Sequence, residues 1–146
     1  MVQSSGLNNP ACGKLYANAC LPMMTTPSMQ VLLDGQVLYS SDGKWLYPLF
    51  DLEEYLEEYP DLLRNATVWD KVIGKAAALL ILRMGGNRVH GVLMSELAAE
   101  VLEKAGVAYS FDSLVPRIDC QTEEILEDIV DPDEAYKLLC ESAGRC

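Results

Sequence analysis

The fold is decided by residues 67–115, which read TVWDKVIGKAAALLILRMGGNRVHGVLMSELAAEVLEKAGVAYSFDSLV. Three β-rich runs alternate here with two stretches of helical pattern, and these runs lie at 67–73, 88–94 and 107–115. The first helix, over 75–84, is almost entirely apolar and ends at two glycines, so it must lie buried against a sheet. The second follows a Ser95 cap and stops at Gly106. This alternation predicts an α/β protein.

The segment upstream adds a hairpin and a helix. MQVLLDGQVLYSSDGKW, residues 29–45, holds two β-rich runs around Asp34-Gly35, a pair that supplies the positive φ angles of a tight turn. Pro48 then opens an acidic surface helix that ends near Pro60.

The segment downstream is helical. A short acidic helix is expected from Gln121 to about Ile129, and a last helix opens at Asp131-Pro132. Hairpin, helix and then alternating strands and helices together predict a three-layer α/β/α sandwich.

Length and composition fit one domain. Half of the 146 residues are hydrophobic, which is enough for a core without disulfides or a structural metal. Residues 1–27 have no helical or strand period, so we expect a flexible N-terminal extension followed by a single domain over 28–146. Neither a signal peptide nor a membrane span is expected, because no basic start precedes an apolar run and no stretch approaches about 18 apolar residues.

Charge and cysteine usage limit the partners and the compartment. Eleven basic and 22 acidic side chains give a net charge of −11, which repels phosphate backbones and anionic lipid, so nucleic acid and membrane surfaces are not expected partners. The cysteines are odd in number and form no Cys-x-x-Cys pair, which favours reduced thiols and a cytoplasmic protein. They are Cys12, Cys20, Cys120, Cys140 and Cys146.

A metal site is not expected. A zinc hydrolase needs three protein ligands around an open position. His90 is the single histidine of the chain, and it stands inside a predicted strand. We interpret it as a hydrogen-bonded strand residue and expect no metal or other cofactor.

Two junctions between a strand and a helix are candidates for a binding pocket. Gly74-Lys75 opens the buried helix without the spacing of a phosphate-binding loop, and a lysine there opposes the helix dipole. Either a bound anion or a nearby carboxylate, Asp70 or Glu96, would compensate it. Ser95-Glu96 forms the second junction, and two adjacent junctions at the carboxyl ends of strands can be the walls of one pocket.

Cys120 is a candidate nucleophile. It precedes a predicted helix, whose N-terminus favours the thiolate, but Asp119, Glu123 and Glu124 oppose a further negative charge. On these grounds an idle thiol is the favoured interpretation, and Glu123 is interpreted as a backbone cap or as a proton-transfer group.

Several stretches resemble one bacterial family of unknown function, DUF1893, which has a cytidine-deaminase-like fold. They are VLLDGQVLYSSDG, YPLFDL, DKVIGKAAALL, LMSELAAEVLEKAGV, YSFDSLVPRI, Cys120-x-x-Glu123 and DIVDPDEAYKLL, in the order of the family. The resemblance implies a mixed sheet of about five strands between helices. The chain departs from the family at Gln121-Thr122, where Pro-Met is expected.

The resemblance also implies where a site would lie. In zinc-dependent deaminases of this fold, a His-Ala-Glu motif opens one buried helix and a Pro-Cys-x-x-Cys motif opens the next. The corresponding helix starts are interpreted as Gly74-Lys75-Ala76 and Ser95-Glu96-Leu97, which lack the zinc ligands. Deaminase chemistry therefore does not follow from the resemblance.

Three functions remain open. The first is binding of a nucleotide-like or anionic small molecule by Gly74, Lys75, Ser95, Glu96 and Arg117. The second is a metal-independent enzyme in which Cys120 is the nucleophile, Lys75 stabilises negative charge or tunes the thiol, and Glu123 or Glu96 moves a proton. The third is an assembly partner that uses the acidic helix at 48–58 and a strand edge, and a homodimer would agree with relatives of this fold.

Overall fold

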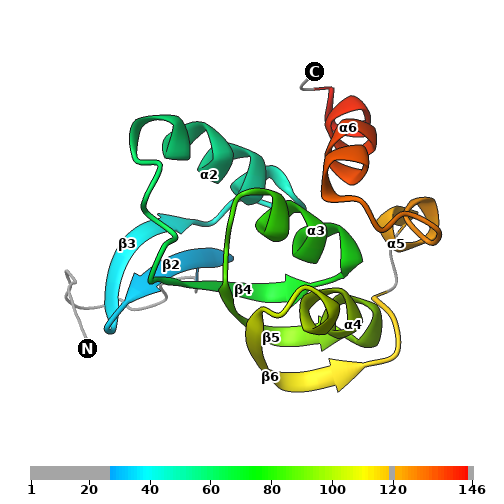
Figure 1. The fold of residues 1–146 in the computed structure, drawn as a ribbon, viewed down its shortest axis with the longest axis horizontal. Helices are drawn as coiled ribbons and strands as arrows, with labels where there is room; N and C mark the ends of the chain where they lie inside the picture. Colours follow the sequence, from blue (N-terminus) through cyan, green and yellow to red (C-terminus); the bar gives the residue numbers. More distant parts are fainter. Residues whose placement is uncertain (1–26, 119–120, 145–146) are drawn as a thin grey trace.

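The computed structural model describes residues 27–118 and 121–144 (Figure 1). Its elements follow the predicted order of hairpin, helix and alternating strands and helices. They are β2 (Met29–Leu33), β3 (Gln36–Ser41), α2 (Tyr47–Glu58), β4 (Thr67–Ile73), α3 (Lys75–Arg83), β5 (Arg88–Ser95), α4 (Glu96–Lys104), β6 (Ala108–Val115), α5 (Gln121–Ile125) and α6 (Pro132–Ala143).

The strands form one open mixed sheet in the order β3-β2-β4-β5-β6. Strand β2 is antiparallel to both neighbours, whereas β4, β5 and β6 run parallel to one another. The predicted hairpin is confirmed: Asp34 (φ 53°) and Gly35 (φ 81°) both adopt the left-handed conformation that joins β2 to β3. Because the parallel strands end at the same edge of the sheet, the N-termini of α3 and α4 lie at that edge.

Helix α3 is the centre of the helical part. It contacts α2, α4, α5 and α6 as well as β4, and Figure 1 shows it between α2 and α4. All residues from Lys75 to Ile81 are buried, as the apolar sequence predicts. The three consecutive alanines Ala76, Ala77 and Ala78 permit this close packing, since small side chains let neighbouring elements approach.

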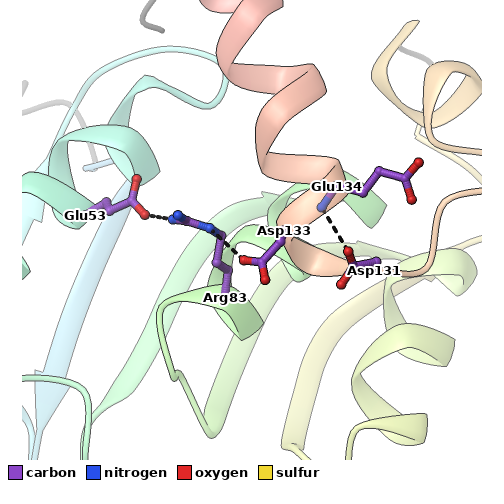
Figure 2. A network of polar contacts seen from close by, with 5 residues as sticks. All are labelled: Glu53, Arg83, Asp131, Asp133 and Glu134. Carbon is purple, nitrogen blue, oxygen red and sulfur yellow. Dashed lines mark hydrogen bonds and ion pairs between the residues drawn. The ribbon is translucent and has the colours of Figure 1, made fainter.

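Arg83, in the last turn of α3, joins three helices (Figure 2). Its guanidinium forms ion pairs with Glu53 of α2 and with Asp133 of α6, the latter at 3.2 Å between Nε and Oδ1. The same guanidinium lies 3.7 Å from the ring centroid of Tyr136 on α6. A cation at a helix C-terminus is also stabilised by the helix dipole. The contacts of Arg83 therefore hold α2 and α6 against the end of α3.

The predicted Ser95 cap is confirmed, and Asp131 caps the helix that the sequence predicts to open at Asp131-Pro132. The Ser95 hydroxyl accepts a hydrogen bond from Ala98 N at 3.0 Å at the start of α4, and Asp131 accepts one from Glu134 N at 3.2 Å at the start of α6. Figure 2 shows the second contact. These caps satisfy N–H groups that have no partner inside the helix.

The predicted fold class is confirmed: the protein is α/β with a mixed sheet of five strands that starts with a hairpin. It is consistent with a three-layer sandwich. Helix α5 is shorter than predicted, because after Ile125 the chain continues in tighter turns, with Glu127 N bonded to Glu124 O and Ile129 N to Leu126 O. No helix in the described part of the chain is long and apolar enough to cross a membrane.

Two expectations concern regions at the ends of the chain. Almost all of the predicted extension, 1–27, lies outside the described residues, so it stays a prediction together with the domain bounds. Cys140 of α6 is buried and disulfide-bonded, so the expectation of reduced thiols does not hold for this residue.

Candidate functional site

The carboxyl group of Glu123 occupies the junction between the N-termini of α3 and α4. Its Oε2 accepts hydrogen bonds from Lys75 N at 2.8 Å and from the Ser95 hydroxyl at 2.9 Å. Its Oε1 accepts a third from Ile118 N at 2.6 Å. The side chain is fully buried, and Oε2 lies 3.1 Å from the position that a Cβ on Gly74 would take. Four predicted site residues, Gly74, Lys75, Ser95 and Glu123, therefore meet at this junction.

The anion that compensates the start of α3 is thus a carboxyl group of the protein itself. The sequence suggested Asp70 or Glu96 for this role, and the structure has Glu123 instead. The Lys75 amine lies elsewhere: it donates to the carbonyl oxygen of Glu127 at 3.0 Å, and the residue is only 6% exposed. Both polar ends of Lys75 are therefore used inside the fold.

The other predicted site residues do not join this junction. Glu96 is exposed and borders an open hollow between α4 and β6, and Arg117 is also exposed. Cys120 lies outside the described residues, so its proposed reaction stays a prediction. Lys75 also borders a cavity of about 300 Å³ that is lined mainly by apolar side chains of α3 and α4.

A catalytic zinc does not fit the residues that the structure describes. The starts of α3 and α4 offer lysine, serine and glutamate but no imidazole or thiolate donor. His90 lies on β5, with Nδ1 2.7 Å from the Ser110 hydroxyl and Nε2 3.3 Å from Asp112 Oδ1 on β6. It is the hydrogen-bonded strand residue that the sequence predicts. No group of three or more His, Cys, Asp or Glu in the described ranges is arranged to hold a metal.

A cavity of about 410 Å³ lies between the start of α2 and the start of α3, and we call it the α2–α3 cavity. Its walls come from the loop before α2, the end of β4 and the first turn of α3. Residues that line it include Trp45, Pro48, Asp70, Val72, Gly74 and Ala77. Of the predicted ligand-binding residues only Gly74 belongs to it. This cavity lies one helix earlier in the chain than the two junctions that the sequence suggested as the walls of a pocket.

Asp70 is the acidic group among the described residues of this cavity. Removal from water raises its pKa from 3.8 to about 7, while hydrogen bonds from the backbone of Val72 and Lys71 act in the opposite direction. The bond from Val72 N to Oδ1 is long, at 3.4 Å. No ion pair joins Asp70 to another residue of the described ranges. A carboxyl group that titrates near neutral pH in a cavity can bind a ligand in either protonation state.

Trp45 lies at the mouth of the cavity in an unusual backbone conformation. Its φ is 57°, in the left-handed region that a bulky residue rarely adopts, and 44% of its surface is exposed. The indole contacts Tyr47 edge to face, with ring centroids 5.4 Å apart. Lys44 and Lys71, which also line the cavity, are exposed. Neither the indole nor these lysines stood out in the sequence, because none belongs to a recognisable motif.

Comparison with known proteins gives a family and a fold. No curated protein matches the chain. A crystal structure of a DUF1893 family protein, TM1506 from Thermotoga maritima, is similar at 24% sequence identity with a TM-score of 0.71, over 80% of each chain. The family model named TM1506, described as a domain of unknown function (DUF1893), matches residues 22–142. Since this match covers most of the sequence, the chain belongs to the DUF1893 family.

Proposed function

We propose that the protein binds a nucleotide-like small molecule, with a planar ring and an anionic group, in the α2–α3 cavity. The observation that carries this proposal is the half-exposed indole of Trp45 beside a cavity of about 410 Å³. That volume lies within the usual range of ligand pockets, roughly 300–1,000 Å³. An indole offers a large flat surface on which a heterocycle can stack.

The lining of the cavity agrees with such a ligand. Apolar residues such as Pro48, Val72 and Ala77 dominate it, and polar groups are few, as is usual where a few placed contacts fix the orientation of a ligand. Lys44 and Lys71 add two positive charges in a protein whose net charge is −11. A phosphate or carboxylate of the ligand would be attracted to this edge of the cavity rather than to the acidic remainder of the surface.

The conformation of Trp45 is a second argument. A left-handed φ at a non-glycine residue costs about 1 kcal/mol, and such strain is concentrated at functional sites. Asp34, the other non-glycine residue with positive φ in the described chain, belongs to the hairpin turn that requires it. Trp45 also lies in a turn, closed by a hydrogen bond from Tyr47 N to Lys44 O at 3.2 Å, but a turn position with positive φ normally holds Gly, Asn or Asp rather than a bulky aromatic residue. We attribute its conformation to the presentation of the indole at the cavity.

A thermal-shift screen of the full chain against nucleosides, nucleotides and phosphorylated sugars tests the proposal. A ligand at about 100 times its dissociation constant adds roughly 2.7 kcal/mol. We expect Trp45→Ala to abolish the shift and Lys71→Ala to reduce it for phosphorylated compounds. The matched controls, Phe111→Ala and Lys104→Ala, replace exposed residues of β6 and α4 and should keep it. If no compound shifts the melting temperature, or if Trp45→Ala keeps the full shift, the proposal is wrong.

The two other functions suggested by the sequence have less support. A catalytic role for Cys120 with Lys75 would require the lysine amine to leave the carbonyl oxygen of Glu127. An assembly role would use the exposed edge strand β6 or the acidic face of α2. Within residues 27–118 and 121–144, neither function has a feature that indicates a substrate or a partner.

A further inference from the structure

We propose that Asp70 recognises the ring of the ligand by hydrogen bonds to its edge: as a neutral carboxyl group it pairs with an acceptor next to a donor, as in adenine, and as a carboxylate it pairs with two adjacent donors, as in guanine. This inference rests on the proposed function and names the class of ring that the α2–α3 cavity would select.

The position of Asp70 supports a direct contact with the ring. The residue lies on β4 and lines the cavity together with Val72, Gly74 and Ala76. A planar ring stacked against Trp45 would turn its edge, not its face, toward the other polar groups of the cavity. Two backbone groups donate hydrogen bonds to the Asp70 side chain, Lys71 and Val72, the latter in a long contact of 3.4 Å from its N to Oδ1. The carboxyl group therefore keeps capacity for two further hydrogen bonds.

The groups around Asp70 leave its charge uncompensated. Its sheet neighbours, Met29 on β2 and Gly91 on β5, carry no titratable side chain. From the first turn of α3 the cavity is lined by alanines, and from the loop after β6 by Ile118. The charged groups that line the cavity beside Asp70 are Lys44 and Lys71, and both are exposed to solvent.

The protonation state of Asp70 then decides which edge fits. Burial raises its pKa to about 7. Below that pH the neutral carboxyl group donates one hydrogen bond and accepts another, which complements the ring nitrogen and amino group of adenine. Above it the carboxylate only accepts, which complements the adjacent N1–H and amino donors of guanine. Adenine affinity should therefore fall, and guanine affinity rise, as pH increases through about 7.

Calorimetric titration of the full chain with AMP and with GMP, at pH 6 and pH 8, tests this inference. If the pKa is about 7, the protonated fraction changes roughly tenfold between these pH values, so AMP should bind about tenfold more tightly at pH 6. Asp70→Asn is the informative variant, because a carboxamide is always both donor and acceptor and pairs with adenine in this way. We expect it to bind AMP at both pH values with equal affinity, apart from the titration of the phosphate itself. Asp70→Ala should lose the preference between AMP and GMP.

The outcomes separate this inference from the proposed function. Suppose that the nucleotides bind, that Trp45→Ala abolishes binding, and that the pH dependence of AMP affinity is the same in the parent and in Asp70→Asn. Asp70 then forms no hydrogen bonds to the edge of the ring. The proposed function would stand in that case. If neither the nucleotides nor any compound of the screen binds, both proposals are wrong. The comparison of parent with Asp70→Asn also removes the effect of the phosphate, whose second pKa of about 6 affects both proteins alike.

Discussion

Replacement of Glu123 should destabilise the protein more than replacement of any exposed acidic residue. The carboxyl group is fully buried and accepts hydrogen bonds from Lys75 N, the Ser95 hydroxyl and Ile118 N. These donors belong to three segments: the start of α3, the residue that caps α4 and the loop after β6. Glu123 therefore connects α5 to both helix starts, and its loss affects all of them together.

The magnitude follows from counting the donors that lose an acceptor. Glu123→Ala leaves two N–H groups and one hydroxyl group unpaired in a buried place, and we expect a loss of about 4 kcal/mol. Glu123→Gln has the same shape but one acceptor oxygen. If that oxygen takes the place of Oε2, the amide group faces Ile118 N–H, which pairs a donor with a donor. We expect about 2 kcal/mol for this variant.

Urea denaturation of the parent and variants measures this directly, because a shift of the midpoint at constant slope reports stability alone. Glu124→Gln is the matched control: the residue is adjacent and exposed, so the change should stay within about 0.5 kcal/mol. The melting temperature should fall by roughly 6 °C for Glu123→Gln and 12 °C for Glu123→Ala. A Glu123→Gln variant as stable as Glu124→Gln would refute the role of the carboxyl group.

Three further predictions concern other parts of the molecule. Between pH 3.8 and about 7 the folded chain keeps a proton on Asp70 that the unfolded chain has released, so this group destabilises the fold as pH rises through that window. Asp70→Asn should therefore be more stable than the parent at pH 8 by about 2 kcal/mol and nearly unchanged at pH 4, as measured by urea titration at both pH values. Arg83→Ala should lose about 1–2 kcal/mol of unfolding free energy in the same assay, whereas Asp133→Asn, at a side chain 82% exposed, should lose less. Gly91→Ala places a Cβ 3.1 Å from Ile73 Cδ1 and should lower stability by about 1–3 kcal/mol, and Ile73→Val in the same chain should recover part of that loss, which a double-mutant cycle measures.

Most of the fold could be predicted because its signals are local. Asp34-Gly35 requires positive φ angles, Ser95 and Asp131 cap their own helices, and the apolar run after Lys75 must be covered on all sides. Each of these signals depends on residues within one turn of the element that it defines. Helix α5 was predicted too long because an acidic segment permits tight turns as well as a helix, and tertiary contacts decide between them.

The candidate site could be predicted only in part, because its contacts span long distances in sequence. A lysine at the start of α3 correctly indicated that an anion was needed, but its source is 48 residues away at Glu123. The α2–α3 cavity depends on how the loop before α2 closes over β4, and no motif marks that loop. The raised pKa of Asp70 likewise arises from burial, which a sequence does not report for a single residue.

Gly74 connects the two halves of this site. On one side it lines the α2–α3 cavity, and on the other a Cβ at this position would lie 3.1 Å from Glu123 Oε2. The absence of a side chain therefore lets the Glu123 carboxyl group approach the start of α3 while the cavity stays open. One consequence is that the anion position at this helix start is already filled by the protein, so an anionic group of a ligand must find its partners at Lys44 and Lys71 instead. A second is that variants of Gly74 or Glu123 would change folding and binding together. Residues of the cavity that take no part in the Glu123 contacts, Trp45 above all, can test the binding function without disturbing the junction between α3 and α4.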